Sequence, residues 1–328
     1  MLTYILRRAA LAVSVVLATL VASFALFFAG PADPAQAMCP EQHCSADRLN
    51  AIRENLGLNR PFAIQFWEYF SGLFVGRDFT VAGDTVHCGA PCLGMSFLTN
   101  RPVTEEVFSR FPATILVTLG AVVIFLIVGV GIGVIAATVR GSALDKFLVG
   151  GSQVFGSIPY YILALLFALY TTRLHPIFPQ AGSISDGVLP FLPGLIAPWL
   201  ILGTVYATGY ARYTRNSMIE TLSMDYVRTA RSKGISEGSV VGRHALRAAL
   251  SPVVTILGMD VATLLGGTLI TEHIFEIDGI GRRALSALGQ DDLPVIMGIV
   301  LLTGVIVVTM NLIVDIAYSY IDPRVRLS

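Results

Sequence analysis

Long apolar segments separated by short polar ones run through most of the chain. A helix needs about 20 mostly apolar residues to cross the hydrocarbon core of a bilayer. Six segments meet this requirement: residues 9–29, 113–139, 147–172, 189–210, 248–271 and 294–321. We interpret the first as a retained span, because it is long and no small-residue cleavage site separates it from a soluble domain. The pattern therefore predicts an all-α integral membrane protein with six transmembrane helices.

The composition agrees with this fold class. Only 13% of the residues are charged and the mean hydropathy is +0.71, whereas soluble domains contain about 25% charged residues. Basic and acidic side chains number 22 each, so the formal net charge is zero. A chain without a net positive field is not expected to bind nucleic acid.

Basic residues are concentrated on one side of the predicted spans. With the N-terminus inside, the cytoplasmic segments contain Arg7, Arg8, Arg140 and Lys146, and seven basic residues between 211 and 250. The short outer loops contain three: Arg173, Arg282 and Arg283. Cytoplasmic loops of membrane proteins carry an excess of Lys and Arg. Both termini are therefore expected in the cytoplasm.

The same pattern divides the chain into four parts. Residues 1–29 would form a short cytoplasmic segment and the first span, and residues 30–112 an extracytoplasmic helical cap. Residues 113–321 would form the transmembrane core, with a cytoplasmic loop at 211–250, and residues 322–328 a cytoplasmic tail.

All four cysteines lie in the predicted cap: Cys39, Cys44, Cys88 and Cys92. Thiols oxidise outside the bacterial cytoplasm, and an even number in one small region indicates two disulfides, with three possible connectivities. A zinc site that also uses His43 and His87 is the alternative, and free thiols are a third.

An amphipathic stripe follows Pro61 in the cap, formed by Phe62, Phe66, Tyr69, Phe70 and Leu73. Such a helix would lie on the outer membrane surface and pack over the spans. The alternative is a docking surface for an external partner.

The stretch "DYVRTARSKG" at 225–234 predicts a short basic helix between two apolar segments. Asp225 is a suitable N-cap, Lys233 would lie in the last turn, and Gly234 would stop the helix in a left-handed conformation. Ser236 would then cap a second helix that runs toward Pro252. The loop is thus expected to be an ordered helix–turn–helix.

One face of this short helix would carry Tyr226, Thr229, Ala230 and Lys233. Thr229 and Ala230 are small and would allow another surface to come close, while Tyr226 is a rigid side chain of the kind enriched at binding hot spots. The alternative is a solvated basic loop that merely follows the charge rule for cytoplasmic segments.

"YVRTARSKG" and the following "RHALRAALSPVVT" resemble the cytoplasmic EAA loop of ABC-importer permeases, specifically the B-type subunits of oligopeptide and dipeptide importers. Arg228, Thr229 and Ala230 occupy the E-A-A places, so only the second alanine is retained. Gly234 matches the glycine of that pattern and Pro252 its closing proline.

The resemblance extends over nearly the whole chain. "MLTYILRR", "RPVTEEVFSRFPATI", "LLGGTLITEHIFEIDGIG" and "NLIVDIAYSYIDPRVR" are similar to segments of the family in the same order. Two departures stand out: Asp278 replaces the usual proline, and the cysteine pairs lie in what look like insertions.

The resemblance implies a permease subunit that forms half of the pathway of an ATP-driven peptide importer in the bacterial inner membrane. Its partners would be a second homologous permease, two P-loop ATPases and an extracytoplasmic peptide-binding protein. Nickel, haem or glutathione are alternative cargoes in the family. The coupling residues would be Asp225, Tyr226, Arg228, Thr229, Ala230, Lys233 and Gly234.

Motifs for catalysis are missing from the sequence. No G-x-x-x-x-G-K-[ST] occurs, so ATP and Mg²⁺ would be bound by the partner ATPases, and no cofactor or enzymatic activity is expected in this chain. "EHIFE" places His273 and Glu276 on one helical face, but no second histidine follows to complete a metal site.

Asp260 lies well inside the fifth predicted span, where an ionisable side chain usually faces a water-filled cavity or a partner. We expect it on the pathway wall, with an inter-helix hydrogen bond as the alternative. A charged residue at this depth also leaves open a self-sufficient secondary transporter or channel, although no internal repeat is evident. An envelope structural protein is a third possibility.

Overall fold

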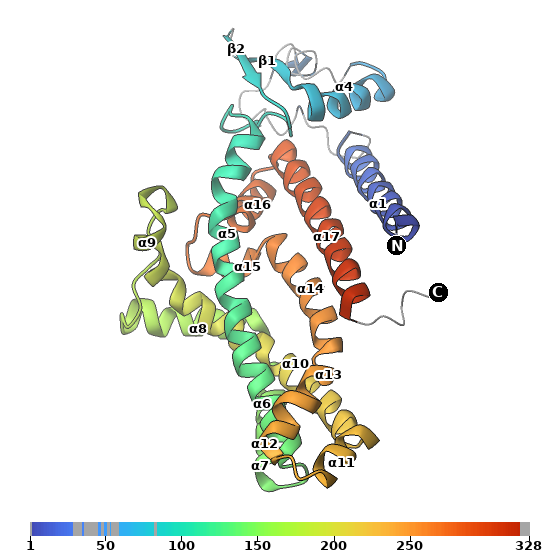
Figure 1. Ribbon diagram of the computed structural model, residues 1–328. Helices are drawn as coiled ribbons and strands as arrows, with labels where there is room; N and C mark the ends of the chain where they lie inside the picture. Colours follow the sequence, from blue (N-terminus) through green and yellow to red (C-terminus); the bar gives the residue numbers. More distant parts are fainter. Residues whose placement is uncertain are drawn as a thin grey trace. The chain divides into compact units, whose positions relative to one another are not determined.

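The computed structural model describes residues 2–28, 59–81 and 84–321, together with the single positions 35, 45, 46, 49, 50 and 53. Most of these residues are helical (Figure 1). Contacts divide the chain into two compact units. Unit 1 comprises Met1–Thr114, Leu265–Leu269 and Asp278–Leu312, and unit 2 comprises Ile115–Leu264, Ile270–Ile277 and Ile313–Ser328. Each of these units combines separate segments of the chain, whereas the division predicted from the sequence cuts the chain into consecutive parts at residues 29, 112 and 321. That division stays a prediction.

Unit 1 contains helices from both ends of the chain and one small sheet. Its elements are α1 (Leu2–Phe28), α4 (Phe62–Val75), β1 (Arg77–Val81), β2 (Asp84–Cys88), the first half of α5 (Val103–Phe125), α16 (Ile280–Gly289) and most of α17 (Leu293–Ile321).

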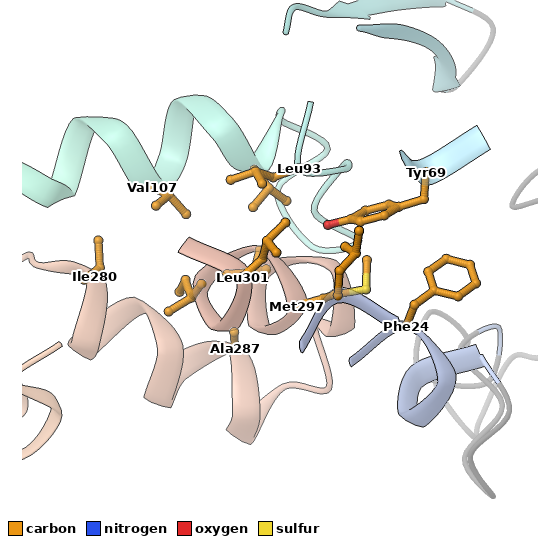
Figure 2. Close-up of a cluster of buried hydrophobic side chains, with 12 residues drawn as sticks. Phe24, Tyr69, Leu93, Val107, Ile280, Ala287, Met297 and Leu301 are labelled. Carbon is orange, nitrogen blue, oxygen red and sulfur yellow. The ribbon is translucent and has the colours of Figure 1, made fainter. Parts of the chain in front are cut away.

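The core of unit 1 forms where apolar residues four apart point to the same side of each helix (Figure 2). The contributing pairs are Leu20 and Phe24 on α1, Val103 and Val107 on α5, and Met297 and Leu301 on α17. This spacing places two side chains one above the other on one helix face. Tyr69 of α4 enters the same cluster, and burial raises the pKa of its hydroxyl to about 12.

The cap contains a β-hairpin that the sequence pattern did not predict. Strands β1 and β2 pair in antiparallel register, from Arg77 opposite Cys88 to Val81 opposite Asp84. The prediction of a purely helical cap is therefore wrong in this part. Each strand has only five residues, one Val and one Thr among them, and is too short to show a clear period, although β-branched residues favour strands. Arg77 lies 4.6 Å from the centre of the Phe79 ring on the same strand.

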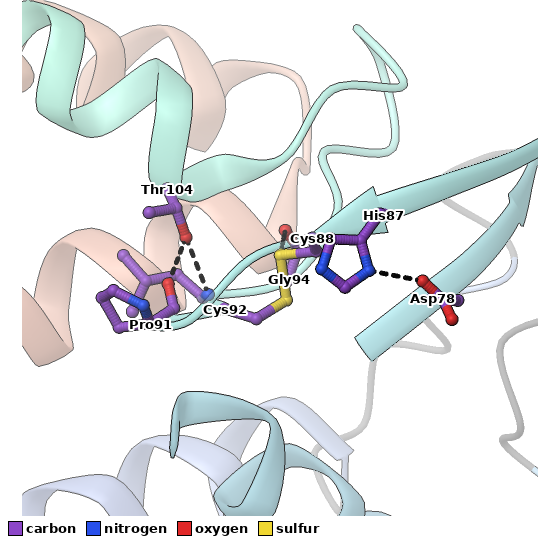
Figure 3. The surroundings of a disulfide bond; sticks show 8 residues. Asp78, His87, Cys88, Pro91, Cys92, Gly94 and Thr104 are labelled. Carbon is purple, nitrogen blue, oxygen red and sulfur yellow. Dashed lines mark hydrogen bonds and ion pairs between the residues drawn. A yellow bond between two sulfur atoms is a disulfide. The ribbon is translucent and has the colours of Figure 1, made fainter. Parts of the chain in front are cut away.

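Cys88, the last residue of β2, forms a disulfide with Cys92 (Figure 3). Thr104 of α5 clamps the loop that contains it, because its hydroxyl donates to the Pro91 carbonyl and accepts from the Leu93 amide. The structure thus links the hairpin to the start of α5. Cys39 and Cys44 lie outside the described residues. Within the described part of the chain, no group of three or more His, Cys, Asp or Glu side chains could hold a metal ion.

Unit 2 consists of helices and short helical turns. Its elements include α6 (Gly131–Thr138), α7 (Ala143–Gly156), α8 (Tyr160–Ala168), α9 (Val188–Phe191), α10 (Ile196–Leu222), α11 (Asp225–Ser232), α12 (Glu237–Ser239), α13 (Leu246–Ala249), α14 (Ser251–Leu265) and α15 (Leu269–Ile274). Wider π-helical turns join several of them: Leu126–Val130, Leu169–Leu174 and Val240–Ala245.

Helix α10 is the centre of unit 2, packing against α6, α7, α8 and α13. Small residues make the closest of these contacts possible. A Cβ atom on Gly129 would lie 2.6 Å from Cβ of Tyr210, and one on Gly133 would lie 2.6 Å from Cβ of Thr214. Glycines four residues apart thus leave a flat strip on one helix where α10 approaches, a packing mode common between membrane helices.

Four helical stretches within the described residues are long and apolar enough to cross a membrane: Arg7–Ala25, Val103–Thr138, Val188–Leu222 and Leu293–Val314. Two bent pairs bring the number to six when each pair counts as one span: Ala143–Gly156 with Tyr160–Leu174, and Glu237–Ala249 with Ser251–Leu265.

Two of the predicted spans, at 147–172 and 248–271, correspond to these bent pairs. The bends are 88° and 52°, and they fall beside Pro159 and Pro252 respectively, where a helix loses a backbone hydrogen bond or must begin anew. The fifth span also ends earlier than predicted, at Leu265. Gly267 follows with φ of 127°, a conformation that a helix cannot accommodate.

Candidate coupling helix and pathway residues

The predicted short helix at 225–234 is present as α11 (Figure 1). Its N-cap is Met224 and not Asp225, which instead lies in the first turn with its side chain almost fully exposed. The Asp225 carboxylate therefore interacts favourably with the positive end of the helix dipole, and it does not accept a hydrogen bond from a backbone amide as an N-cap side chain would. Gly234 ends the helix at φ of 77°, as the sequence predicted.

The buried side of α11 faces its own chain. Val227, Ala230 and Val240 form a small apolar cluster, with Leu222 and Ile235 packed against it. Ala230 is only 7% exposed. Its small side chain therefore allows the second half of the loop to come close, and the expectation that it meets a partner surface needs correction.

The exposed side of α11 carries Tyr226, Arg228 and Thr229, and the exposed Lys233 follows as its C-cap. Arg228 lies 3.7 Å from Asp225 in an ion pair open to solvent. Thr229 donates its hydroxyl back to the Asp225 carbonyl at 2.9 Å. The Tyr226 side chain is 45% exposed, and this set of residues forms the surface available to another protein.

Arg231 holds the two halves of the loop together. Its guanidinium donates to both carboxylate oxygens of Glu237, at 3.0 and 2.6 Å. These hydrogen bonds to the Glu237 carboxylate raise the pKa of Arg231. A two-pronged contact of this kind fixes orientation as well as distance, so α11 and α12 keep one geometry.

Helix α11 is also attached closely to the long helix before it. Ser223 and Met224 alone separate the end of α10 at Leu222 from the start of α11. Beyond α11, Met218 of α10 packs against Ala245 and Ala249. A two-residue link and side-chain packing thus connect α11 with α10, and α10 with the segment that leads into α14.

An ion pair ties α7 to α10 in unit 2. Asp145 is 3% exposed and accepts two hydrogen bonds from Arg215, each 2.7 Å long. The Gly141 amide donates to the same carboxylate at 2.9 Å. Ser142 caps α7 by accepting from the Asp145 amide. The spacing Ser-x-x-Asp before an apolar run is a signal for such a cap. Nothing in the sequence, however, indicates that Arg215 binds the Asp145 carboxylate.

Asp260 of α14 is half-buried, and the Tyr210 hydroxyl of α10 donates to it at 2.8 Å. The Tyr210 ring packs against Phe125 with 4.5 Å between ring centres. The hydrogen bond considered for Asp260 from its depth in the span is thus present. The role of Asp260 in a pathway remains a prediction.

Unit 1 contains a second buried charge cluster that sequence reasoning missed. Arg283 of α16 donates to Glu106 at 2.7 Å and to Asp292 at 2.8 Å. The Ser96 hydroxyl donates to Oδ2 of Asp292, the oxygen that Arg283 also contacts, and the Phe97 amide donates to Oδ1. Burial lowers the pKa of Arg283, but the hydrogen bonds and the charges of Glu106 and Asp292 outweigh it and raise that pKa. The cluster joins α5, α16 and the turn before α17.

Several apolar helices of membrane-spanning length, with one short basic helix whose outer face is exposed, define a multi-pass membrane protein. The chain belongs to the family of binding-protein-dependent transport system inner membrane components, whose profile matches residues 129–327. A second profile, for the N-terminal part of such membrane components, matches residues 1–118. The protein is therefore a multi-pass inner membrane component of a system that also includes a binding protein and an ATPase.

Two relatives are similar over almost the whole chain. The dipeptide transport system permease protein DppB of Alkalihalophilus pseudofirmus is 34% identical over 348 residues, covering 99% of this chain and 100% of the relative. The dipeptide transport system permease protein DppB of Escherichia coli K12 is 33% identical over 351 residues, covering 99% of both chains.

Proposed function

We propose that this chain is one of two permease subunits that together form the pathway of an ATP-driven peptide importer. Relatives named as dipeptide permeases match it from end to end, which supports peptides as the cargo. A second homologous permease would complete the pathway, and two P-loop ATPases would bind ATP and Mg²⁺. An external peptide-binding protein would deliver the cargo.

The observation that carries the mechanism is the joint between α10 and α11. Two residues link these helices, and the apolar cluster around Val227 and the clamp between Arg231 and Glu237 keep α11 from moving independently. When the ATPases close around ATP, a groove on one of them would carry α11 with it. The bound ATP would thereby bias the spans between inward-open and outward-open arrangements.

The contact with the ATPase would use the exposed residues of α11, namely Tyr226, Arg228, Thr229 and Lys233. Asp225 would complement the helix dipole, while Ala230 and Gly234 would maintain the shape of the loop. The excess of basic residues in the segments around α11 supports a cytoplasmic position for it and for both termini.

We place Asp260 on the wall of the pathway. Its carboxylate is only partly buried although it lies within α14, and a single tyrosine hydroxyl satisfies one of its oxygens. A partly exposed acid in a membrane helix usually faces water.

A cross-linking experiment tests the contact. A photo-crosslinking amino acid at Thr229, in the assembled transporter, should form an adduct with an ATPase subunit. The same amino acid at Gln290, an exposed position at the end of α16, lies on the opposite side of the membrane in the proposed orientation and serves as the control. An adduct between position 290 and an ATPase, with none from position 229, would overturn the proposal.

Reconstitution separates this function from its main rival. Proteoliposomes that contain this chain, its partner permease and the ATPases, supplied with the external peptide-binding protein, should accumulate peptide only with ATP. Peptide uptake by this chain alone, driven by an ion gradient and abolished by Asp260→Asn, would instead identify a secondary transporter.

A further inference from the structure

Helix α4 carries apolar side chains on two different sides. Its inner side packs in the core of unit 1 through Phe66, Tyr69, Phe70 and Leu73. Its outer side carries four large apolar side chains with exposed fractions of 47%, 65%, 69% and 80%: Ile64, Trp67, Phe74 and Val75. Steps of three and seven residues keep Ile64, Trp67 and Phe74 on one helix face. An exposed apolar face of this kind marks a contact with a membrane or with another protein.

The end of a candidate membrane span lies against α4. The span-length part of α1 is Arg7–Ala25. Phe24, at the end of this part, meets Phe62 and Phe66 of α4 edge to face, with ring centres 5.2 and 5.4 Å apart. Figure 2 shows Phe24 beside Tyr69, which also belongs to α4. A helix fixed to the last turn of a span lies where hydrocarbon gives way to headgroups, the level at which Trp is enriched. This position favours lipid as the cover of the outer side of α4.

One arginine follows directly after α4. Arg77 begins β1, and its side chain folds back over the last turns of the helix, since a Cβ atom on Gly72 would lie 3.2 Å from Cδ of Arg77. The guanidinium carbon lies 5.4 Å from the centre of the Tyr69 ring and 4.6 Å from that of Phe79. Aromatic rings attract a cation without cancelling its charge. The two rings therefore hold Arg77 in place and leave its charge to interact with an anion.

Arg77 has no acidic partner among the described residues. Arg283 donates to two buried carboxylates, whereas no hydrogen bond or ion pair joins Arg77 to any described residue. Nε of Arg77 is buried, and burial lowers the pKa of the guanidinium. Glu68 is an acid whose charge reaches Arg77, but it forms its ion pair with Arg60. A cation that is partly withdrawn from water is unfavourable without an anion beside it.

We propose that α4 lies in the membrane–water interface and that Arg77 binds the phosphate of a phospholipid whose acyl chains cover Phe74 and Val75. The planar fork of a guanidinium matches phosphate oxygens in pairs, and the exposed apolar side of α4 provides the contact for the chains. The apolar side and the cation thus follow each other in the same order as the two parts of the lipid. The site does not depend on the cargo, and by the proposed orientation it belongs to the outer leaflet.

Fluorescence of Trp67 tests the apolar part of the site. The chain contains two tryptophans, so the difference between wild type and Trp67→Phe isolates the emission of Trp67. Both proteins are placed in nanodiscs whose phosphatidylcholine is brominated on the acyl chains near the headgroup. The brominated lipid should lower this emission at least about twofold, because the apolar side of an interfacial helix enters the acyl boundary by about 5–10 Å. Unchanged emission would overturn the proposal.

The same difference is then measured in the assembled transporter. Contact with lipid predicts equal quenching in the chain alone and in the assembly. Quenching that disappears in the assembly, or on addition of the external peptide-binding protein, would show that a protein covers α4 and would overturn the assignment to lipid. Peptide uptake is measured separately, so that failure of the proposed function and failure of the lipid site are distinguished.

A second reporter tests the phosphate part of the site. Phe74→Trp combined with Trp67→Phe moves the tryptophan to an exposed position at the end of α4, nearer to Arg77. Brominated phosphatidylglycerol should quench it about threefold more than brominated phosphatidylcholine at equal mole fraction, because an arginine near the membrane surface attracts a lipid with net negative charge. Arg77→Met in this background should remove the preference. Equal quenching by the two lipids before that substitution, or an unchanged preference after it, would overturn the phosphate site.

Arg101→Met is the matched control, because it removes the same charge from an exposed arginine of the same unit and should keep the preference. Arg77→Lys retains a cation and should keep part of it, which separates loss of charge from loss of packing between the rings. Raising the salt from about 0.1 to about 1 M shortens the Debye length from about 10 to about 3 Å and should weaken the preference without any substitution at Arg77. A preference that salt does not change, equal losses in Arg101→Met and Arg77→Met, or a lysine variant that behaves like Arg77→Met would each contradict a phosphate at Arg77.

Discussion

Arg215 of α10 holds Asp145 of α7 through two parallel hydrogen bonds of 2.7 Å, from Nε to Oδ1 and from Nη2 to Oδ2. This geometry fixes both the distance and the angle between the two side chains. Arg215 is seven residues before the end of α10 at Leu222, which leads directly into α11. The pair therefore holds the part of unit 2 that would move with the coupling helix.

Replacing one member of the Arg215–Asp145 pair should reduce stability more than replacing both. Asp145→Leu or Arg215→Met alone leaves one charge without its partner, whereas the double variant leaves neither. We expect both single variants to melt at a lower temperature than the double variant, a non-additivity typical of charges in contact. Thermal unfolding of the three variants in detergent checks this, and strictly additive shifts would contradict it.

Breaking the buried charge cluster around Arg283 in unit 1 should lower the free energy of unfolding by more than separating Arg215 from Asp145. Arg283→Met would leave Glu106 and Asp292 buried without their shared cation, since Asp292 is fully buried and Arg283 only 9% exposed. Loss of one partner of a buried pair costs about 3–5 kcal/mol. Arg283→Lys keeps the charge but cannot reach both acids as Nε and Nη2 of Arg283 do, and it should fall between this variant and wild type. Denaturant unfolding measures the differences, with Arg101→Met, at an exposed arginine of the same unit, as the control.

The inward position of Ala230 changes what a substitution there should do. Ala230→Arg would force a long charged side chain into the cluster with Val227 and Val240, so it should destabilise the loop by about 1–3 kcal/mol as well as impair transport. Thr229→Arg changes the exposed neighbour and should leave stability within about 0.5 kcal/mol. ATP hydrolysis and peptide uptake measured together should show hydrolysis without matching uptake in Thr229→Arg. Full coupling in that variant would contradict a partner contact at this face.

Gly234 is required for its backbone conformation and not for space. Its φ is 77°, and a Cβ atom there would meet nothing within 4 Å. Gly234→Val should therefore cost about 1–2 kcal/mol through left-handed strain, and Gly234→Asn less. Gly238→Val, at a helical position that is equally open, is the control. Similar losses of thermal stability for the two valine variants would disprove this explanation.

Two substitutions separate the possible roles of Asp260. Asp260→Asn keeps an oxygen that can accept from Tyr210 but removes the charge, whereas Tyr210→Phe removes the hydrogen bond and keeps the charge. A residue on the pathway wall should show a several-fold loss of uptake in Asp260→Asn with stability nearly unchanged. Equal behaviour of the two variants, with a loss of stability of about 1 kcal/mol in each, would indicate a structural hydrogen bond only.

The sequence carried strong signals for two parts of the molecule. Apolar runs of sufficient length predicted the spans, since only a continuous hydrophobic segment can remain in lipid. The glycine at position 234 predicted the end of the short helix because the requirement for positive φ is local to one residue. Family membership could also be inferred from motif order, and the family profiles confirm it.

The bends in two of the predicted spans were harder to predict. Pro159 and Pro252 are visible in the sequence, but a proline only permits a bend, and the angles of 88° and 52° depend on what packs beside it. The hairpin at Arg77–Cys88 was missed because its pairing is a contact between two strands, each too short to show a period.

By itself, the sequence determined which segments enter lipid, where the short basic helix stops and which family the chain joins, because these properties depend on local composition and order. Tertiary structure alone decided that Ala230 points inward, that Arg215 meets Asp145 across 70 positions, and that Phe24 of α1 meets Phe66 of α4. Side chains distant in sequence become partners only after helices pack. That choice depends on shape and burial, which a linear pattern does not encode.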